Sequence, residues 1–556
     1  MISRFDLWRL ALSLVSGLAL ALAFPNYNLT LLAWVSLAGL IFASIGASLP
    51  QAALCGFAYG TALYTFSLPW IYTVMRQYGP LPIWEAAAVM ALLVIQQSLL
   101  CVIFSVALAW IARHSANRAL LAAPFLWVAV ELLRSRLGPL SFPWDLLGYA
   151  VSRNLALVQL TSITGIYGLS FLVAAYNALF VWLLRAAIWR ELASPWFANG
   201  AHQTPVSSTS KSSGSAPTPP PPTVRPRPWR VLSRPPVAVW VATSLILLAV
   251  SEFGGNLVPR THPTAIAHLV QTDLPTLAEF PANWDAIHSA DMAQLDRLSI
   301  AAGQKQPGLI VWPEVPAPFS LQQAAFAQRA MGIARESKSD FLLGVVDWKL
   351  VGRPAAAGVV SKPAGEIRQA PYNSAALLDP SGREEFLYDK IHLVPFSEYV
   401  PGRSLLWFAK DLTALAGDFQ HGTRYAVGDL PGGRFGVFIC YEAVFPDEVR
   451  RFARAGAGLL INISNDGWLG RSSGPAQSLI MARVRAVENR RWLLRDTNNG
   501  FTASIDPYGR IDASMPPDVR GELPVAYDFR NDLTFYTRWG DWFAWLCVAV
   551  GVCFLF

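Results

Sequence analysis

Long apolar runs without charged residues dominate the first part of the chain. No charge lies between Arg9 and Arg76, and at about 20 residues per membrane span this stretch has room for three helices, with breaks at 25–28 and 49–51. Soluble cores rarely supply so many long uncharged runs. Further uncharged runs cover residues 86–112, 119–130, 154–184, 235–251 and 543–556. The pattern predicts eight membrane helices, with six in 1–190, a seventh at 236–254 and an eighth at 540–556.

A different pattern covers residues 262–532, where short apolar runs alternate with amphipathic stretches. The runs have the length of strands: AIAHLV, GLIVW, FLLGVV, SAALL, FGVFI, GLLINI and TASI. Helical periodicity lies between them, around 286–302, 321–337, 446–455 and 475–490. This alternation predicts a layered α/β domain, in which chemistry gathers at the carboxyl ends of the strands.

Residues 191–235 lie between the sixth and seventh predicted spans. Positions 201–230 are rich in Ser and Pro and have almost no large apolar side chains, so they cannot bury enough surface to fold. We therefore expect a disordered cytoplasmic linker. A proline-rich ligand for a partner is the alternative to a plain spacer.

Composition supports a membrane part joined to a soluble part. The chain has 556 residues, of which 53% are hydrophobic and only 15% charged, against about 25% charged in ordinary soluble proteins. The first 180 residues hold only twelve of the 81 charges. The composition therefore argues against a purely cytosolic globular enzyme. The net charge of +7 does not indicate nucleic acid, because no helix is rich in Arg and Lys.

The basic residues also predict how the chain crosses the membrane. With the N-terminus in the cytoplasm, the basic segment 185–234 falls on a cytoplasmic loop, as the positive-inside rule requires. Arg134 and Arg136 fall outside and break the pattern, which contacts with lipid phosphates would explain. A cleaved signal peptide is the alternative to the first span, but further spans follow at once, so we expect a retained anchor.

Cysteine usage singles out one thiol. Four of the five cysteines lie in predicted spans, which leaves Cys440 alone in the soluble domain. It ends the run GVFIC just before a helical stretch, where helix N–H groups and a nearby cation can stabilise a thiolate. This position predicts a nucleophile, and an inert buried cysteine is the alternative.

Acidic and basic residues follow other strand-like runs. Glu314 comes after LIVWP, and Lys390 lies in YDKIHLVPFSEYVP. Taken singly they are weak candidates, and Glu398 and Glu442 could be ordinary ion-pair partners. A Cys–His dyad that uses His392 also stays open, because imidazole commonly activates thiols. The histidines show no HExxH or paired-cysteine spacing, so we expect no metal site.

The motifs taken together resemble a known family. WPE at 312–314, DKIHLVPFSEYVPG at 389–402, CYE at 440–442 and ISNDGW at 463–468 are similar to the Glu-Lys-Cys signature of the nitrilase superfamily, in the same chain order. HLVPFSEYVP, NISNDGW, MARVRAVENRR and TNNG, joined to a multi-span membrane part, resemble the bacterial apolipoprotein N-acyltransferases. Ser397 and Gly467 depart from the residues common in that family.

The resemblance implies a fold and a reaction. The fold would be a polytopic helical membrane part carrying an α-β-β-α sandwich domain. The reaction would move an acyl chain from a phospholipid, through a cysteine thioester, to the N-terminal amino group of a diacylated apolipoprotein, without a cofactor. The protein would lie in the bacterial inner membrane, with the catalytic domain on the periplasmic side, and we expect a monomer. A membrane-tethered carbon-nitrogen hydrolase and a non-enzymatic receptor or scaffold are the alternatives.

The resemblance also implies roles for single residues. Cys440 would be the nucleophile, Glu314 the base and Lys390 the oxyanion partner. Glu314 would need a raised pKa to act as a base near neutrality. Supporting residues would be Glu398, Glu442 and Tyr441, and lipid contacts would come from Trp284, Trp468 and Arg491. Core packing is the alternative for each of the aromatic residues.

Overall fold

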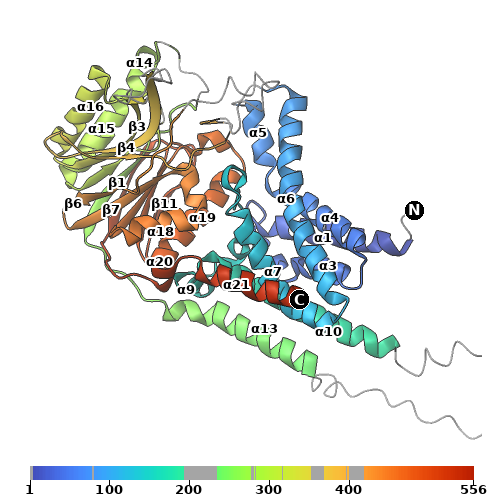
Figure 1. Ribbon diagram of the computed structural model, residues 1–556. Coiled ribbons are helices and arrows are strands. Elements are labelled where there is room, and N and C mark those ends of the chain that lie inside the picture. The colour runs from blue at the N-terminus through green and yellow to red at the C-terminus, as the bar shows by residue number, and fades with distance from the viewer. Residues whose placement is uncertain are drawn as a thin grey trace, which may run out of the picture.

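The computed structural model describes two parts, a bundle of apolar helices and a two-sheet domain (Figure 1). The described residues are 4–77, 81–192, 235–276, 281, 283–315, 317–351, 368–395, 397–399 and 419–556. The predicted linker at 191–235 lies outside the described residues except at its two ends.

The helical part follows the apolar runs. Its longer helices are α1 (Arg4–Ala23), α4 (Leu49–Ser67), α6 (Ile83–Ala112), α7 (Ala116–Arg134), α10 (Ile166–Leu192), α13 (Pro235–Phe253) and α21 (Trp542–Leu555). Among the described residues, four helices are long and apolar enough to cross a bilayer: Ile83–Ala112, Ala116–Arg134, Ile166–Ala186 and Pro236–Leu257. Leu7–Ala23, Thr30–Ser44, Leu155–Thr164 and Trp542–Leu555 are shorter apolar helices. The predicted total of eight spans is therefore not confirmed by helix length.

Two predicted boundaries change in the structure. The break expected at 49–51 lies earlier, because Ser48 and Gln51 form a capping box and Pro50 falls in the first turn of α4, where proline is tolerated. The run 154–184 is not one helix, since Gly165 interrupts it before α10 begins. Gly165 has a φ of 64°, and a Cβ there would lie 2.6 Å from the Tyr536 ring.

The second domain is built on two six-stranded sheets. The first has the order β12-β1-β2-β3-β4-β5 and the second β11-β10-β9-β8-β7-β6. The first sheet consists of β1 (Ala265–Gln271), β2 (Leu309–Val311), β3 (Asp340–Val351), β4 (Arg368–Leu378), β5 (Glu384–Asp389) and β12 (Gly521–Tyr527). The second consists of β6 (Val427–Leu430), β7 (Gly433–Ile439), β8 (Leu459–Ser464), β9 (Trp492–Thr497), β10 (Thr502–Ile505) and β11 (Ile511–Met515). The central strands β1, β2 and β3 run parallel, as do β7, β8 and β9.

Helices cover the outer faces of both sheets, as the α-β-β-α prediction requires. Apolar residues of α15 (Ser289–Lys305) and α16 (Ala324–Ser337) share one buried cluster with the outer face of the first sheet. A second cluster joins residues of both sheets to α18 (Pro446–Arg454) and α19 (Gly474–Asn489). Removing this much apolar surface from water is the main stabilising contribution to such a sandwich.

Helix α19 also joins the domain to the membrane part. Its Ala482 and Ala486 pack with the second sheet, whereas Met481, Val484 and Val487 belong to the apolar core of the membrane helices. Figure 1 shows α19 between the second sheet and the helical bundle. The amphipathic helix predicted at 475–490 is therefore buried on two sides, which explains why apolar residues occupy more than one of its faces.

Candidate active site

Glu314 follows β2 and is held by three neighbours. Its side chain is only 7% exposed. Its Oε1 lies 2.9 Å from Lys390 Nζ and accepts a hydrogen bond from Asn373 Nδ2 at 2.7 Å. Its Oε2 accepts from the backbone N–H of Asn465 at 2.9 Å. Both carboxylate oxygens are therefore fixed inside the domain.

Lys390 directly follows β5 and lies between two carboxylates. It is 1% exposed, and its Nζ is 2.9 Å from Glu314 Oε1 and 3.0 Å from Glu398 Oε1. Its backbone N–H donates to Asn373 O at 2.8 Å. The structure thus brings together the predicted base, the predicted oxyanion partner and the predicted supporting glutamate.

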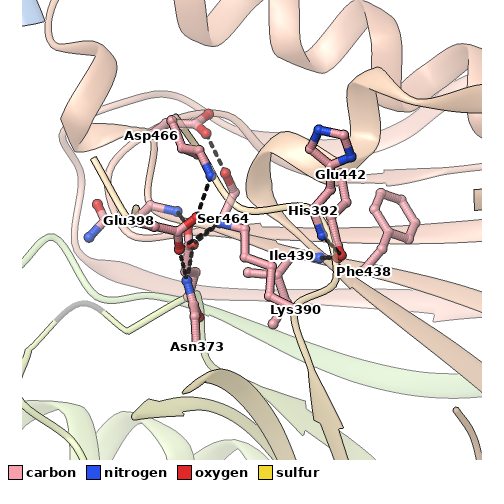
Figure 2. A network of polar contacts seen from close by, with 12 residues as sticks. Asn373, Lys390, His392, Glu398, Phe438, Ile439, Glu442, Ser464 and Asp466 are labelled. Carbon is pink, nitrogen blue, oxygen red and sulfur yellow. Dashed lines mark hydrogen bonds and ion pairs between the residues drawn. The ribbon is translucent and has the colours of Figure 1, made fainter. Parts of the chain in front are cut away.

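Asn373 is a site residue that the sequence prediction missed. Its Nδ2 donates to Glu314 Oε1 and to Glu398 Oε1, each at 2.7 Å (Figure 2). The residue lies within β4 and is buried. An amide directly before the apolar run SAALL was the signal that could have indicated it, since buried polar groups need partners.

The charges of this cluster set its protonation state. Burial acts to lower the pKa of Lys390, but the carboxylates of Glu314 and Glu398 outweigh it and raise that pKa. Burial acts to raise the pKa of Glu314, but Lys390 and the hydrogen bonds from Asn373 outweigh it and lower that pKa. Our expectation that the pKa of Glu314 is raised is therefore wrong. Glu314 is therefore an ionised carboxylate in this arrangement.

Cys440 directly follows β7 and is the first residue of the short helix η5 (Cys440–Val444). We call this position the cysteine turn. The residue is partly exposed, and its φ of 49° lies in the left-handed region, which a non-glycine residue rarely adopts. Burial raises the pKa of the thiol and the Glu314 carboxylate adds to this, whereas Lys390 lowers it. Cys440 is therefore a neutral thiol, and the Glu314 carboxylate lies near enough to affect its charge.

Glu442 ties the cysteine turn to the lysine segment. Its Oε1 accepts from Tyr388 Oη at 2.7 Å and from the backbone N–H groups of Ile391 at 2.7 Å and His392 at 3.1 Å. Its Oε2 accepts from the backbone N–H of Ile439 at 2.7 Å (Figure 2). Burial raises the pKa of Glu442 to about 7. One carboxylate thus fixes the residues before Cys440 against those after Lys390.

A second polar contact orders the turn after β8. Ser464 Oγ donates to Asp466 Oδ1 at 2.7 Å, and Arg495 pairs with Asp466 Oδ2 at 2.7 Å. The turn lies beside the acidic cluster in Figure 2. Because Asn465 lies between Ser464 and Asp466, these contacts orient its backbone N–H, which donates to Glu314.

His392 is engaged elsewhere. Its Nδ1 lies 2.9 Å from Glu448 Oε1, and its ring stacks on Phe445 with the centroids 3.7 Å apart. Within the described part of the chain, no hydrogen bond joins His392 to Cys440. His392 is thus paired with Glu448, whereas Glu314 and Lys390 are among the charged groups that shift the pKa of the Cys440 thiol.

Tyr441 faces the membrane part. Its ring stacks on those of Phe142 and Trp144, each with the centroids 6.5 Å apart, and meets Phe445 edge to face at 5.2 Å. The residue after the predicted nucleophile therefore contacts the loop that follows α7.

The predicted lipid contacts lie in three different surroundings. Trp284 is 2% exposed and packs on His288 and Phe319 in the core beneath the first sheet, so the structure does not bring it to the cluster. Arg491 is 1% exposed, and it donates to four backbone carbonyls, those of Ala457, Asn489, Arg490 and Asp532. Arg491 therefore binds the backbone inside the domain, which corrects the expectation that it contacts lipid. Trp468 is partly exposed in η6 (Asp466–Leu469), which packs beside α5 (Pro69–Gln77).

A metal site has no donor set among the described residues. No group of three or more His, Cys, Asp or Glu side chains there is arranged to hold an ion. The chemistry that this cluster can perform is nucleophilic, with a thiol, a carboxylate and a buried ammonium group.

Family models and relatives match both parts of the chain. The apolipoprotein N-acyltransferase N-terminal domain matches residues 16–179, and the carbon-nitrogen hydrolase domain matches residues 267–527. An apolipoprotein N-acyltransferase of Geobacter metallireducens is 36% identical over 97% of this chain and 93% of its own length. One of Bradyrhizobium diazoefficiens is 30% identical over 98% of this chain and 94% of its own. The crystal structure of Saccharomyces cerevisiae Nit3, in the nitrilase superfamily, covers 48% of this chain and 90% of that one, at 20% identity and a TM-score of 0.34.

Proposed function

Because this chain belongs to the apolipoprotein N-acyltransferase family, we propose that it transfers an acyl chain from a phospholipid to the N-terminal amino group of diacylated apolipoproteins. The observation that carries the proposal is the pairing of Lys390 with Glu314 beside a cysteine turn whose next residue, Tyr441, stacks on the membrane part. This supports a nucleophilic cluster that lies against the part of the chain that meets lipid.

The first half-reaction would acylate Cys440. The Glu314 carboxylate takes the proton of the thiol while Sγ attacks the ester carbonyl of the phospholipid. Lys390 has three N–H donors, of which two are directed at carboxylates, and we assign the third to the developing oxyanion. When the ester C–O bond breaks, the leaving lysophospholipid oxygen takes the proton from Glu314, and a thioester remains.

The second half-reaction would release the acyl chain as an amide. The neutral amino group of the acceptor attacks the thioester carbonyl and gives a proton to Glu314. The C–S bond then breaks, and the leaving sulfur takes that proton back. Asn373, Glu398 and Glu442 act as positioning residues in both halves, since they hold Glu314, Lys390 and the cysteine turn in place.

The alternative, a membrane-tethered carbon-nitrogen hydrolase, is less well supported. Such an enzyme needs a soluble amide or nitrile and has no use for contacts between its active site and a multi-helix membrane part. The relatives carry the acyltransferase name over more than 90% of both chains, so the similarity is not confined to the hydrolase domain.

The proposed topology has eight spans, a cytoplasmic N-terminus and the catalytic domain outside the cytoplasm. It is supported by the basic segment 185–234 and by the contacts of two arginines that broke the positive-inside pattern. Arg134 is buried and donates to Phe142 O at 2.8 Å. Arg136 pairs with Asp447 at 3.2 Å and with Asp541. Both have partners in the protein, so neither needs a cytoplasmic position or a lipid phosphate.

The test of the proposed function is thioester formation. Protein in detergent micelles is mixed with phospholipid labelled in its acyl chain, denatured, and treated with hydroxylamine. We expect label that survives denaturation, is released by hydroxylamine, and is absent from Cys440→Ser, because serine lacks the reactivity of the thiol. Adding a diacylated lipopeptide should discharge the label onto its amino group. An unlabelled wild-type protein would contradict the proposal.

A further inference from the structure

Gln477, near the start of α19, is joined to the membrane part through both polar atoms of its side chain. Its Oε1 accepts from Trp144 Nε1 at 2.8 Å and from Trp70 Nε1 at 3.0 Å. Its Nε2 donates to Ser67 O at 3.0 Å and to Pro25 O at 3.3 Å. The side chain is 2% exposed. One catalytic-domain residue therefore binds three separate segments of the membrane part, at 25, 67–70 and 144.

The contact with Trp144 leads to the cysteine turn. Phe142 and Trp144 stack on each other with the centroids 5.9 Å apart, and both stack on Tyr441. Tyr441 Oη also lies 3.5 Å from Ser141 O. We call residues 141–144 the aromatic loop. Because Tyr441 directly follows Cys440, the position of this loop affects how an acyl donor reaches the thiol.

Arg134 also holds the aromatic loop. Its guanidinium donates to the carbonyls of Phe142 and Trp144 and to Tyr64 Oη. The backbone of the loop is thus fixed by the membrane part, whereas its Trp144 side chain is fixed by Gln477. The loop is held between the two parts of the chain.

We propose that Gln477 is a positioning residue, which through Trp144 sets the aromatic loop against the cysteine turn and so aligns Cys440 with acyl chains that arrive from the bilayer. The proposal rests on the proposed function. Gln477 acts through Trp144 and touches no reacting group. Only a side chain with one acceptor and one donor end can satisfy two indole N–H groups and two carbonyls together.

The chemistry itself does not depend on Gln477. Among the residues that the structure describes, every hydrogen bond of Glu314 and Lys390 comes from within the catalytic domain. Loss of Gln477 should therefore affect a donor that must come from the membrane more than a soluble donor that reaches the thiol from water. A general loss of folding would affect both donors alike.

The experiment compares two acyl donors in the full-length protein. We expect Gln477→Leu to reduce kcat/KM for acylation by a long-chain phospholipid by about ten- to a hundredfold, mainly through KM, because it orphans buried N–H and C=O groups. Acylation by a short-chain soluble ester should stay within about threefold of wild type. The matched control is Gln304→Leu on the exposed face of α15, which should leave both donors unchanged.

Trp144→Phe is the milder variant, because it keeps an aromatic ring and removes the N–H that binds Gln477. It should also lose more activity on phospholipid than on the soluble donor. Adding Gln477→Leu should lower kcat/KM for phospholipid little further, since the two residues share one contact. An equal loss on both donors, or phospholipid kinetics like those of Gln304→Leu, would overturn the proposal. Wild-type protein that forms no thioester with either donor would overturn the proposed function instead.

Discussion

The Glu488 carboxylate of α19 accepts a hydrogen bond from the backbone N–H of Ile166, the first residue of α10, over 2.9 Å. The first N–H groups of a helix lack partners within it, and its dipole favours a negative charge at that end. Arg485 Nε pairs with Glu488 Oε2 at 2.9 Å, and both side chains are fully buried. A charged pair of the catalytic domain thus caps a membrane helix.

Removal of one partner should destabilise the protein strongly. We expect Glu488→Leu to reduce the free energy of unfolding by about 3–5 kcal/mol, because it leaves Arg485 buried without a counter-charge. Glu385→Leu is the control, since Glu385 pairs with Arg383 at an exposed site and should cost at most about 1 kcal/mol. Thermal unfolding in detergent measures both, and equal stabilities would contradict the capping role.

The base can be identified by comparing two variants. Glu314→Gln should prevent acylation, because an amide cannot take the thiol proton, and His392→Ala should retain most of it, because His392 is bound to Glu448. Lys390→Met should also impair acylation, through loss of oxyanion stabilisation worth roughly 3–4 kcal/mol. Thioester formation is the readout. Acylation that persists in Glu314→Gln and disappears in His392→Ala would reverse the assignment.

Glu442 should make stability depend on pH. Its pKa is raised from the usual 4.5 to about 7, so between these values the folded state binds a proton that the unfolded state has lost. Stability from this group therefore falls as the pH rises from about 4.5 to 7. Gln at 442 does not titrate, so the advantage of wild type over Glu442→Gln in thermal unfolding should shrink from pH 5 to pH 8. A difference in thermal stability between the two proteins that stays constant from pH 5 to pH 8 would contradict the raised pKa of Glu442.

Topology can be tested with a thiol reagent that does not cross membranes. In a background without the partly exposed Cys440 and the exposed Cys553, Trp348→Cys provides an exposed site in the catalytic domain, and Ser210→Cys provides one in the predicted linker. We expect labelling at 348 but not at 210 in cells with a permeable outer membrane and an intact inner membrane. Permeabilised cells should label at both positions. The opposite pattern would place the catalytic domain in the cytoplasm.

Deletion of residues 201–230 should leave activity on phospholipid largely intact, because their composition is that of a spacer and the proposed topology puts them on the side opposite the active site. Replacement of the membrane part by a single anchor should abolish that activity, since each acyl methylene exposed to water costs about 0.8 kcal/mol. Both proteins are assayed with long-chain phospholipid and a short-chain soluble ester. Full phospholipid activity of the single-anchor protein would support the tethered hydrolase.

The cysteine turn illustrates how far local patterns lead. The run GVFIC predicts a strand that ends at Cys440, and the strand β7 and the turn confirm it. Glu314 and Lys390 are likewise placed by the ends of the strands before them. Strand ends are readable because alternation and length are local properties of the chain. That these three residues act together was inferred from a resemblance, because their separation along the chain says nothing of distance.

The sequence by itself determined the division into a membrane part and an α/β domain, since charge-free length and strand periodicity are properties of contiguous segments. It could not determine the roles of Asn373 and Gln477, whose partners lie on other elements, or the burial of Arg491 on backbone carbonyls. It also gave the wrong direction for the pKa of Glu314, because burial is suggested by apolar neighbours while the position of Lys390 is set only by packing. Contacts between distant segments depend on how the sheets and helices pack, and that was decided by the tertiary structure.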